Sequence, residues 1–122
     1  MKPFGLLIAA ALAVGAAAPA LAQGKPVKVA LIADSTGPLE AYAKQTIAGF
    51  KLGLEYLTKG SNTVAGRKIE LIEKDSQTKP DVGRNLLAEA YGDLDVDIAV
   101  GGTSSAVALA MRGASASSGS CD

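Results

Sequence analysis

An alternation between apolar strand patterns and amphipathic helix patterns most constrains the fold of this chain. Val27–Ala33 is almost continuously apolar, which is typical of a parallel strand covered on both faces. A helix pattern follows from about Glu40 to Lys59. Its apolar residues recur at intervals of four and three, and we expect them to pack in the core: Ala43, Ile47, Phe50, Leu54 and Leu57.

The same alternation is repeated twice. Lys68–Lys74 mixes charged and apolar residues, which predicts a strand near an edge of the sheet. A second helix runs from Pro80 to about Tyr91, and a third strand over Asp97–Gly101 leads into a third helix. Short loops and right-handed crossovers then predict an α/β fold, a three-layer parallel sheet of strand order 2-1-3. The third strand would lack a neighbour on its outer side.

The first 22 residues differ in composition from the rest of the chain. Lys2 is followed by the uncharged apolar run Leu6–Ala18, and Pro19–Ala22 ends in an Ala-x-Ala pattern. This predicts a signal peptide over residues 1–22, cleaved after Ala22, and export to the periplasm. The alternative is a membrane anchor, but the run is shorter than the roughly 20 residues that a span requires.

Charge, histidine and cysteine content exclude several function classes. The chain has 12 basic and 12 acidic residues, so no bulk charge would attract nucleic acid. It contains no histidine, which excludes histidine-based nucleophilic triads and histidine metal sites within it. The single cysteine, Cys121, cannot form a disulfide within the chain. We expect a protein that is not an enzyme and carries no cofactor.

The loop after the third strand suits an anionic ligand. Gly101–Gly102 forms a turn, and Ser104 and Ser105 open the following helix. A helix N-terminus offers free N–H groups and the positive end of the helix dipole. Ligands of open α/β sheets also bind at the carboxyl ends of strands. A carboxylate or phosphate site and an ordinary serine N-cap are both consistent with this pattern.

Two aspartates follow predicted strands at the same edge of the sheet. Together, Asp34 and Asp75 could bind Mg²⁺, as in phosphoacceptor domains of similar topology. The third strand, however, ends in Gly101–Gly102 and supplies no acid. Turn capping by both aspartates is therefore favoured, and no metal site is predicted.

Four segments, taken in order, resemble the periplasmic solute-binding proteins of branched-chain amino-acid ABC transporters, the leucine-binding type. They are Val27–Ile32, Thr36–Tyr42, Gly66–Asp75 and Val100–Ser105. The resemblance implies the first part of lobe 1 of a type I periplasmic-binding-protein fold, in which two α/β lobes close on a ligand.

The resemblance also implies how the chain is divided. Residues 23–111 would form a partial N-terminal lobe, and the Gly/Ser-rich residues 112–122 a disordered tail. Family members are typically about three times the mature length of this chain. We therefore expect a truncated protein, and a frameshift after Met111 would account for the abrupt change in composition.

Four residues are expected to contact the ligand because of this resemblance. Ser105 would bind a carboxylate through its hydroxyl and backbone N–H, and Ser104 is the second choice because either serine can be the cap. Tyr42 would cover the ligand's side chain, or else be an ordinary half-buried helix residue. Leu39 would border the same cleft.

The implied function is solute binding outside the cytoplasm for an ABC transporter. The ligand would be a branched-chain or related amino acid or a similar small carboxylate, and the partner a membrane permease. Alternatives are a ligand-sensing domain, or a binding protein for amides, urea-like solutes or aromatic acids. The sequence does not identify the ligand, because the side-chain pocket of this family comes largely from the other lobe.

Overall fold

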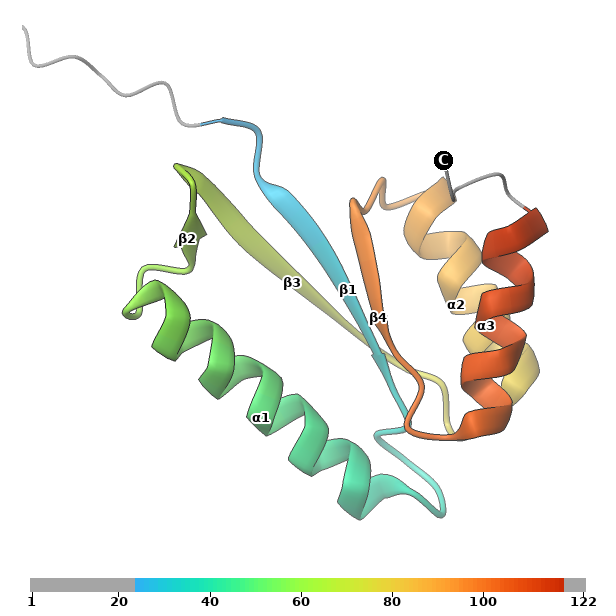
Figure 1. Cartoon of the computed structure of the whole chain (residues 1–122). Helices are drawn as coiled ribbons and strands as arrows, with labels where there is room; N and C mark the ends of the chain where they lie inside the picture. Colours follow the sequence, from blue (N-terminus) through green and yellow to red (C-terminus); the bar gives the residue numbers. More distant parts are fainter. Residues whose placement is uncertain (1–23, 118–122) are drawn as a thin grey trace, which may run out of the picture.

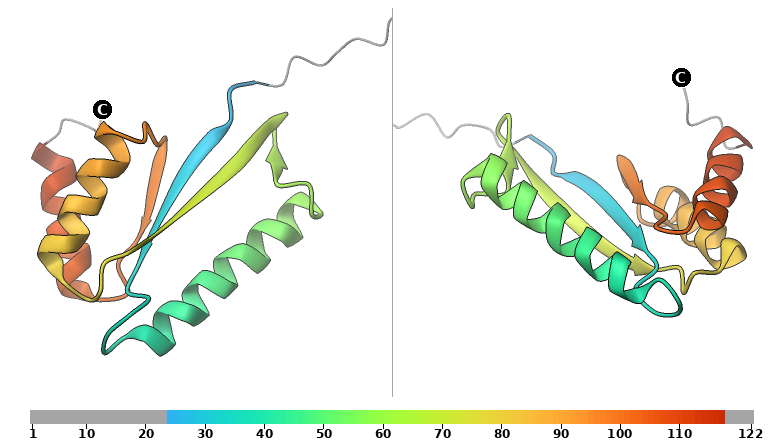
Figure 2. Two further views of the ribbon diagram at one scale, coloured as in Figure 1. Left: turned by 180° about the vertical axis from the view of Figure 1, so that it is seen from behind. Right: turned by 60° about the horizontal axis from the view of Figure 1, so that its bottom comes forward.

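The fold is a four-stranded sheet with helices on both faces, seen in a computed structural model that describes residues 24–117 (Figure 1). The elements in chain order are β1 (Val27–Ala33), α1 (Glu40–Thr58), β2 (Thr63–Val64), β3 (Arg67–Asp75), α2 (Pro80–Gly92), β4 (Ile98–Gly101) and α3 (Ser105–Ser117). Helix α1 covers one face of the sheet, and α2 and α3 cover the other (Figure 2). The predicted signal peptide and Cys121 lie outside the described residues.

The sheet has the order β2-β3-β1-β4, with β1 parallel to both β3 and β4. This confirms the predicted order 2-1-3 for the three parallel strands, with the most apolar strand in the centre. The short antiparallel strand β2 was not predicted. It forms because Ala65 and Gly66 both adopt positive φ, of 50° and 76°, the geometry of a tight hairpin turn.

The main core lies between the sheet and the α2–α3 pair. Strand β1 supplies Ala30 and Ile32, both completely buried, to a cluster that also contains Leu87, Ala90, Val96, Val107 and Met111. Gly83 brings α2 close to α3, since a Cβ at this position would lie 2.6 Å from Cγ1 of Val107. The two helices therefore pack side by side on one face of β1.

The opposite face is covered less completely, and part of the predicted apolar stripe of α1 is exposed. Ala43 is buried and the middle of the stripe is half-buried, but Leu57 is 80% exposed. The expectation that Leu57 packs in the core is therefore wrong. Thr58, the next residue, is buried, so the end of α1 is still covered on one side; Leu57 lies, like Leu52 and Tyr56, on a side of the helix that the described residues leave exposed.

Strand β4 is at the edge of the sheet, as predicted. Within residues 24–117 it pairs only with β1, and Ile98 and Val100 are 49% and 37% exposed. Such an edge has backbone N–H and C=O groups available for pairing. No helix in this range is long and apolar enough to cross a membrane.

Helix α3 continues past Met111 to Ser117, into the segment expected to be disordered. The expectation of disorder is wrong for residues 112–117. Ala114 packs against the core cluster, and the hydroxyl of Ser115 donates to the Met111 carbonyl at 3.2 Å. These contacts explain how a Gly/Ser-rich stretch remains helical. Residues 118–122 lie outside the described part of the chain.

Candidate ligand-binding site

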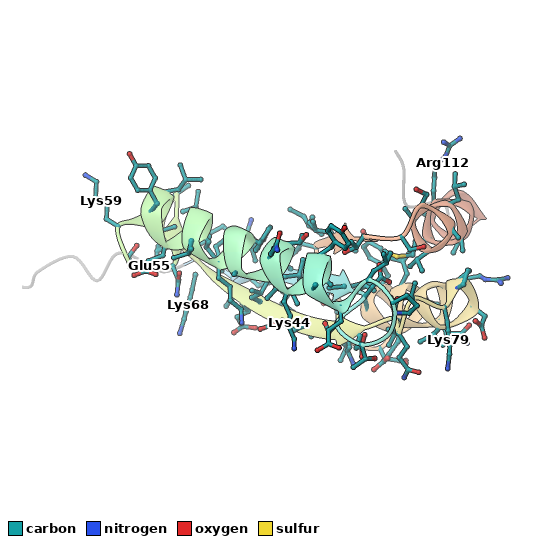
Figure 3. The ribbon with its side chains drawn as sticks, turned by 90° about the horizontal axis from the view of Figure 1, so that it is seen from below. Lys44, Glu55, Lys59, Lys68, Lys79 and Arg112 are labelled. Atoms are coloured by element: carbon teal, nitrogen blue, oxygen red, sulfur yellow. The ribbon has the colours of Figure 1, made fainter. Side chains whose placement is uncertain are left out.

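Three loops gather at the carboxyl edge of the sheet. Because β1, β3 and β4 are parallel, the loops β1–α1, β3–α2 and β4–α3 all leave the same edge, at the bottom of Figure 1. Seen from this end, α1 lies apart from the α2–α3 pair, with Lys44 on α1 and Lys79 at the start of α2 (Figure 3). Ligands of open α/β sheets bind at this edge.

The β4–α3 loop requires its two glycines. Gly101 has φ of 153° and Gly102 has φ of 85°, which side chains other than glycine rarely adopt. A Cβ on Gly101 would collide with the carbonyl of Ile32, and a Cβ on Gly102 would lie 2.9 Å from Cβ of Ala108. The Gly102 N–H also donates to the Ile32 carbonyl at 3.0 Å. The loop backbone therefore lies directly against the end of β1.

Ser104 and Ser105 occupy different positions at the start of α3. The Ser104 carbonyl accepts the first helical bond, from the Ala108 N–H at 2.9 Å, so Ser104 is at the N-cap position. The N–H of Ser104 donates to Oδ2 of Asp34 at 2.6 Å. Ser105 is the first helical residue and is exposed. Of the two serines, Ser105 is the more exposed, since Ser104 is half-buried.

Asp34 is completely buried at the end of β1. Its Oδ1 accepts a hydrogen bond from the hydroxyl of Ser76, and its Oδ2 accepts the Ser104 N–H. The expectation of turn capping is wrong for Asp34, because these bonds reach residues 42 and 70 positions away and link separate loops. The participation of Ser76 was not predicted, because a serine after a strand is common in loops and its sequence position does not reveal its burial.

Asp75 holds the β1–α1 loop from the end of β3. Its carboxylate accepts the Thr36 hydroxyl at 2.7 Å and the Thr36 N–H at 3.2 Å. It also accepts the Gln77 N–H at 2.9 Å, which forms a local turn. Burial alone would raise the pKa of Asp75, but these bonds, with a further backbone bond from Ser35, outweigh burial and hold the pKa below its ordinary value. The predicted capping role is confirmed.

Replacing Asp75 by asparagine is expected to destabilise the chain by about 1 kcal/mol at pH 7, because the charge-assisted bonds to Thr36 and Gln77 weaken. The folded pKa is depressed, so this stabilisation is present above the unfolded value of about 4 and is lost as pH falls through the folded value. Urea unfolding at pH 7 and pH 3 measures the difference. Asp93→Asn, at the exposed end of α2, is the control. An equal effect of Asp75→Asn at both pH values would contradict the assignment.

The carboxylates at this edge are occupied by O–H and N–H donors. Each carboxylate oxygen of Asp34 and of Asp75 accepts at least one hydrogen bond from the loops at this edge. Among residues 24–117, no group of three or more histidine, cysteine, aspartate or glutamate side chains is arranged to hold a metal ion.

A hollow of about 210 Å³ lies between α1 and the β4–α3 loop. Its lining residues come from β1, α1, β4 and the β4–α3 loop: Leu31, Ile32, Ala33, Thr46, Val100, Gly101, Gly102 and Thr103. Its walls are mainly apolar, with the hydroxyl residues Thr46 and Thr103 on its two sides. The prediction did not include these two threonines, although Thr46 is one helical turn after Tyr42 and Thr103 precedes the two serines.

None of the four predicted contact residues lines this hollow. Ser104 and Ser105 follow Thr103, and Tyr42 is one turn before Thr46 on α1. Tyr42 is 63% exposed, and its carbonyl accepts the Thr46 hydroxyl at 3.0 Å. Leu39 precedes α1 and is half-buried. The structure thus places Leu39 and Tyr42 on one element, and Ser104 and Ser105 on another, at the same edge of the sheet.

Comparisons with known proteins agree with this architecture. A family described as "Periplasmic binding protein" matches residues 26–120. Two solved structures from Rhodopseudomonas palustris, described as an ABC transporter and an ABC-type branched-chain amino acid transporter, are 56% identical over 75% of this chain, with TM-scores of 0.72. A solute-binding protein of an ABC transporter from R. palustris BisB5, solved with 3,4-dihydroxybenzoic acid, is 34% identical over 74% of the chain, with a TM-score of 0.67. No curated protein matches at the same significance.

The chain spans only about a quarter of these solved structures, covering 27%, 24% and 24% of their lengths. It corresponds to the first part of their fold. The family match extends over most of the sequence, from the residue before β1 to beyond the end of α3. The chain therefore belongs to the periplasmic binding protein family.

Proposed function

We propose that this chain provides the first ligand-binding loops of a solute-binding protein of an ABC transporter. The observation that carries the proposal is a hollow at the carboxyl edge of the sheet, lined by β1, α1, β4 and the β4–α3 loop, with the exposed first residue of α3 close by in the chain. Such an edge recognises a small molecule through backbone N–H groups and hydroxyls. Binding and delivery, with no chemical change of the ligand, would be its activity.

The proposed ligand is a branched-chain amino acid or another small carboxylate. The first class is favoured by the 56% identical relative described as a branched-chain amino acid transporter. Aromatic acids are favoured by the 34% identical protein solved with 3,4-dihydroxybenzoic acid. Both classes contain a carboxylate, which suits the N-terminus of α3. Apolar walls such as Leu31 and Val100 suit the rest of either molecule.

In this proposal each predicted residue has a separate role. Ser105 donates its hydroxyl and N–H to the ligand's carboxylate, and Ser104 contributes mainly as the N-cap. Tyr42 is exposed on the first turn of α1, where its ring could cover the ligand's apolar part. Leu39 borders the same space from the end of the loop.

The proposed cellular setting follows from the family and the leader. The protein would be exported to the periplasm, with its signal peptide cleaved after Ala22 and the mature chain beginning at Gln23. It would deliver its ligand to a membrane permease of the ABC transporter.

Ligand-observed NMR titration of residues 23–122 tests the proposal with leucine, isoleucine, benzoate and 3,4-dihydroxybenzoate. We expect at least one to bind with a Kd of about 1 mM or weaker, because a single lobe leaves much of the ligand in water. Ser105→Ala should weaken this binding by about three- to tenfold through loss of a charge-assisted hydrogen bond. Ser61→Ala, at the far end of α1, is the matched control. Equal weakening by both substitutions would contradict the role of Ser105.

A further inference from the structure

Asp34 connects three elements that are distant in sequence. It follows β1, it accepts the hydroxyl of Ser76 at the end of β3, and it accepts the N–H of Ser104 at the start of α3. The Asp34 side chain is 0% exposed, as is Ser76. The backbone N–H of Ser76 donates to the Ala33 carbonyl at 2.8 Å, which holds Ser76 beside Asp34.

A buried carboxylate is tolerated only when its oxygens are paired with donors. Ser76 and the Ser104 N–H supply one donor to each oxygen of Asp34. Breaking either bond leaves a buried charged oxygen without that donor, which is strongly unfavourable. Asp34 therefore restricts both partners to one arrangement more tightly than a solvent-exposed cap would.

The restriction acts on the loop that carries the proposed ligand contact. Gly102 is held by the carbonyl of Ile32, at 3.0 Å, and Ser104 is held by Asp34, at 2.6 Å. The loop is thus fixed to β1 on both sides of Thr103, which lines the hollow. Since Ser104 is the N-cap, its position sets the direction of the next residue, Ser105, and of the first turn of α3.

We infer that Asp34 is a positioning residue that fixes the N-terminus of α3 for ligand binding. The inference rests on the proposed function, in which Ser105 contacts the ligand. Asp34 acts by accepting the Ser104 N–H, and its own side chain is buried, so it does not contact the ligand itself. Its contribution is to hold the loop before the ligand arrives, so that less ordering is needed on binding.

Two substitutions of Asp34 separate the effect of its hydrogen bonds from the effect of its charge. Asp34→Asn keeps an oxygen for the Ser104 N–H, while its NH₂ group can donate to Ser76, whose hydroxyl turns to the Ala33 carbonyl. Asp34→Ala removes both bonds. Asp97→Ala is the matched control, because Asp97 accepts the Lys28 N–H at 2.9 Å at the opposite end of the sheet.

Amide hydrogen exchange and ¹⁵N–¹H spectra of residues 23–122 provide the test. The Ser104 amide is expected to exchange at least about tenfold more slowly in the wild type and Asp34→Asn than in Asp34→Ala, with Asp97→Ala like the wild type. On titration with 3,4-dihydroxybenzoate and isoleucine, amide shifts over residues 103–106 should persist in Asp34→Asn and be lost in Asp34→Ala.

The outcomes distinguish this inference from the function on which it rests. One outcome is that the Ser104 amide exchanges slowly, that this protection depends on Asp34, and that no ligand shifts any amide of the wild type. This outcome would overturn the proposed function but would support the role of Asp34 in holding the loop. Fast exchange of Ser104 in the folded wild type would overturn the inference, as would an Asp34→Ala variant with unchanged exchange and shifts. If Asp34→Ala does not fold, Asp34→Leu replaces it, because leucine fills the space without accepting the Ser104 N–H: unchanged Ser104 exchange and ligand-induced shifts in that variant would also overturn the inference.

Discussion

Gly101→Ala is expected to lower the free energy of unfolding by roughly 2–4 kcal/mol, the largest effect of any single substitution considered. The backbone φ of 153° at Gly101 is unfavourable for alanine, and the added Cβ would collide with the Ile32 carbonyl. Because this carbonyl is backbone in the central strand, it cannot move without disturbing the β1–β4 pairing. Urea unfolding followed by circular dichroism measures the loss.

Gly53→Ala is the matched control for this substitution. Gly53 lies in α1, and nothing lies within 4 Å of the Cβ that alanine would add. Alanine is the better helix former, so this variant should be more stable by about 0.5–1 kcal/mol. Equal stability of Gly101→Ala and the wild type would show that the β4–α3 loop does not lie against β1 as described.

Gly83→Ala is expected to cost about 1–3 kcal/mol, although Gly83 is in a helix where alanine is usually favourable. The new Cβ would lie 2.6 Å from Cγ1 of the completely buried Val107, so α2 and α3 would have to separate or Val107 would have to leave its position. Thermal unfolding of the variant, with Gly53→Ala again as the control, measures this cost.

A double-mutant cycle tests whether the cost of Gly83→Ala comes from its contact with Val107, between α2 and α3. Val107→Ala removes Cγ1, so Gly83→Ala in that background should be neutral or stabilising. The expected coupling between the two sites is favourable and about 1–2 kcal/mol. Independent, additive effects would contradict the close packing of α2 on α3.

The arrangement of the parallel strands could be predicted because their patterns are local and strong. Val27–Ala33 is apolar at nearly every position, and a strand of this kind has to be covered on both faces. The charged positions of Lys68–Lys74 placed the next strand nearer an edge, and in the structure it pairs with β1 on one side and the short β2 on the other. Short loops and crossover handedness then left one order for the three parallel strands.

Burial on α1 could not be predicted in the same way. Helical periodicity identifies an apolar face, but it does not say whether another element covers that face. Ala43 is buried and so is Thr58 at the end of α1, whereas Leu57, the residue before Thr58, is exposed. Similarly, the composition of residues 112–117 indicated disorder, but Ala114 packs against the core cluster, to which α2 contributes Leu87 and Ala90.

The sequence predicted which loop would carry the candidate site, but it did not predict the hydrogen bonds within the site. The glycines and serines after β4 marked the correct edge of the sheet, because strand ends and helix starts have recognisable residues. The link from Ser76 through Asp34 to Ser104 joins residues about 40 and 70 positions apart in sequence. Such contacts follow from strand register, which a single sequence does not specify.

The central claim is that a small carboxylate binds where the β1–α1 and β4–α3 loops meet. An amide-resolved NMR titration of residues 23–122 with 3,4-dihydroxybenzoate, repeated with isoleucine, tests it most directly. The account predicts saturable shifts for at least one ligand, concentrated at residues 36–42 and 103–106, at the carboxyl edge of the sheet. Saturable shifts concentrated at the far end of α1, around Leu52–Gly60, or no saturable shifts with either ligand, would contradict it.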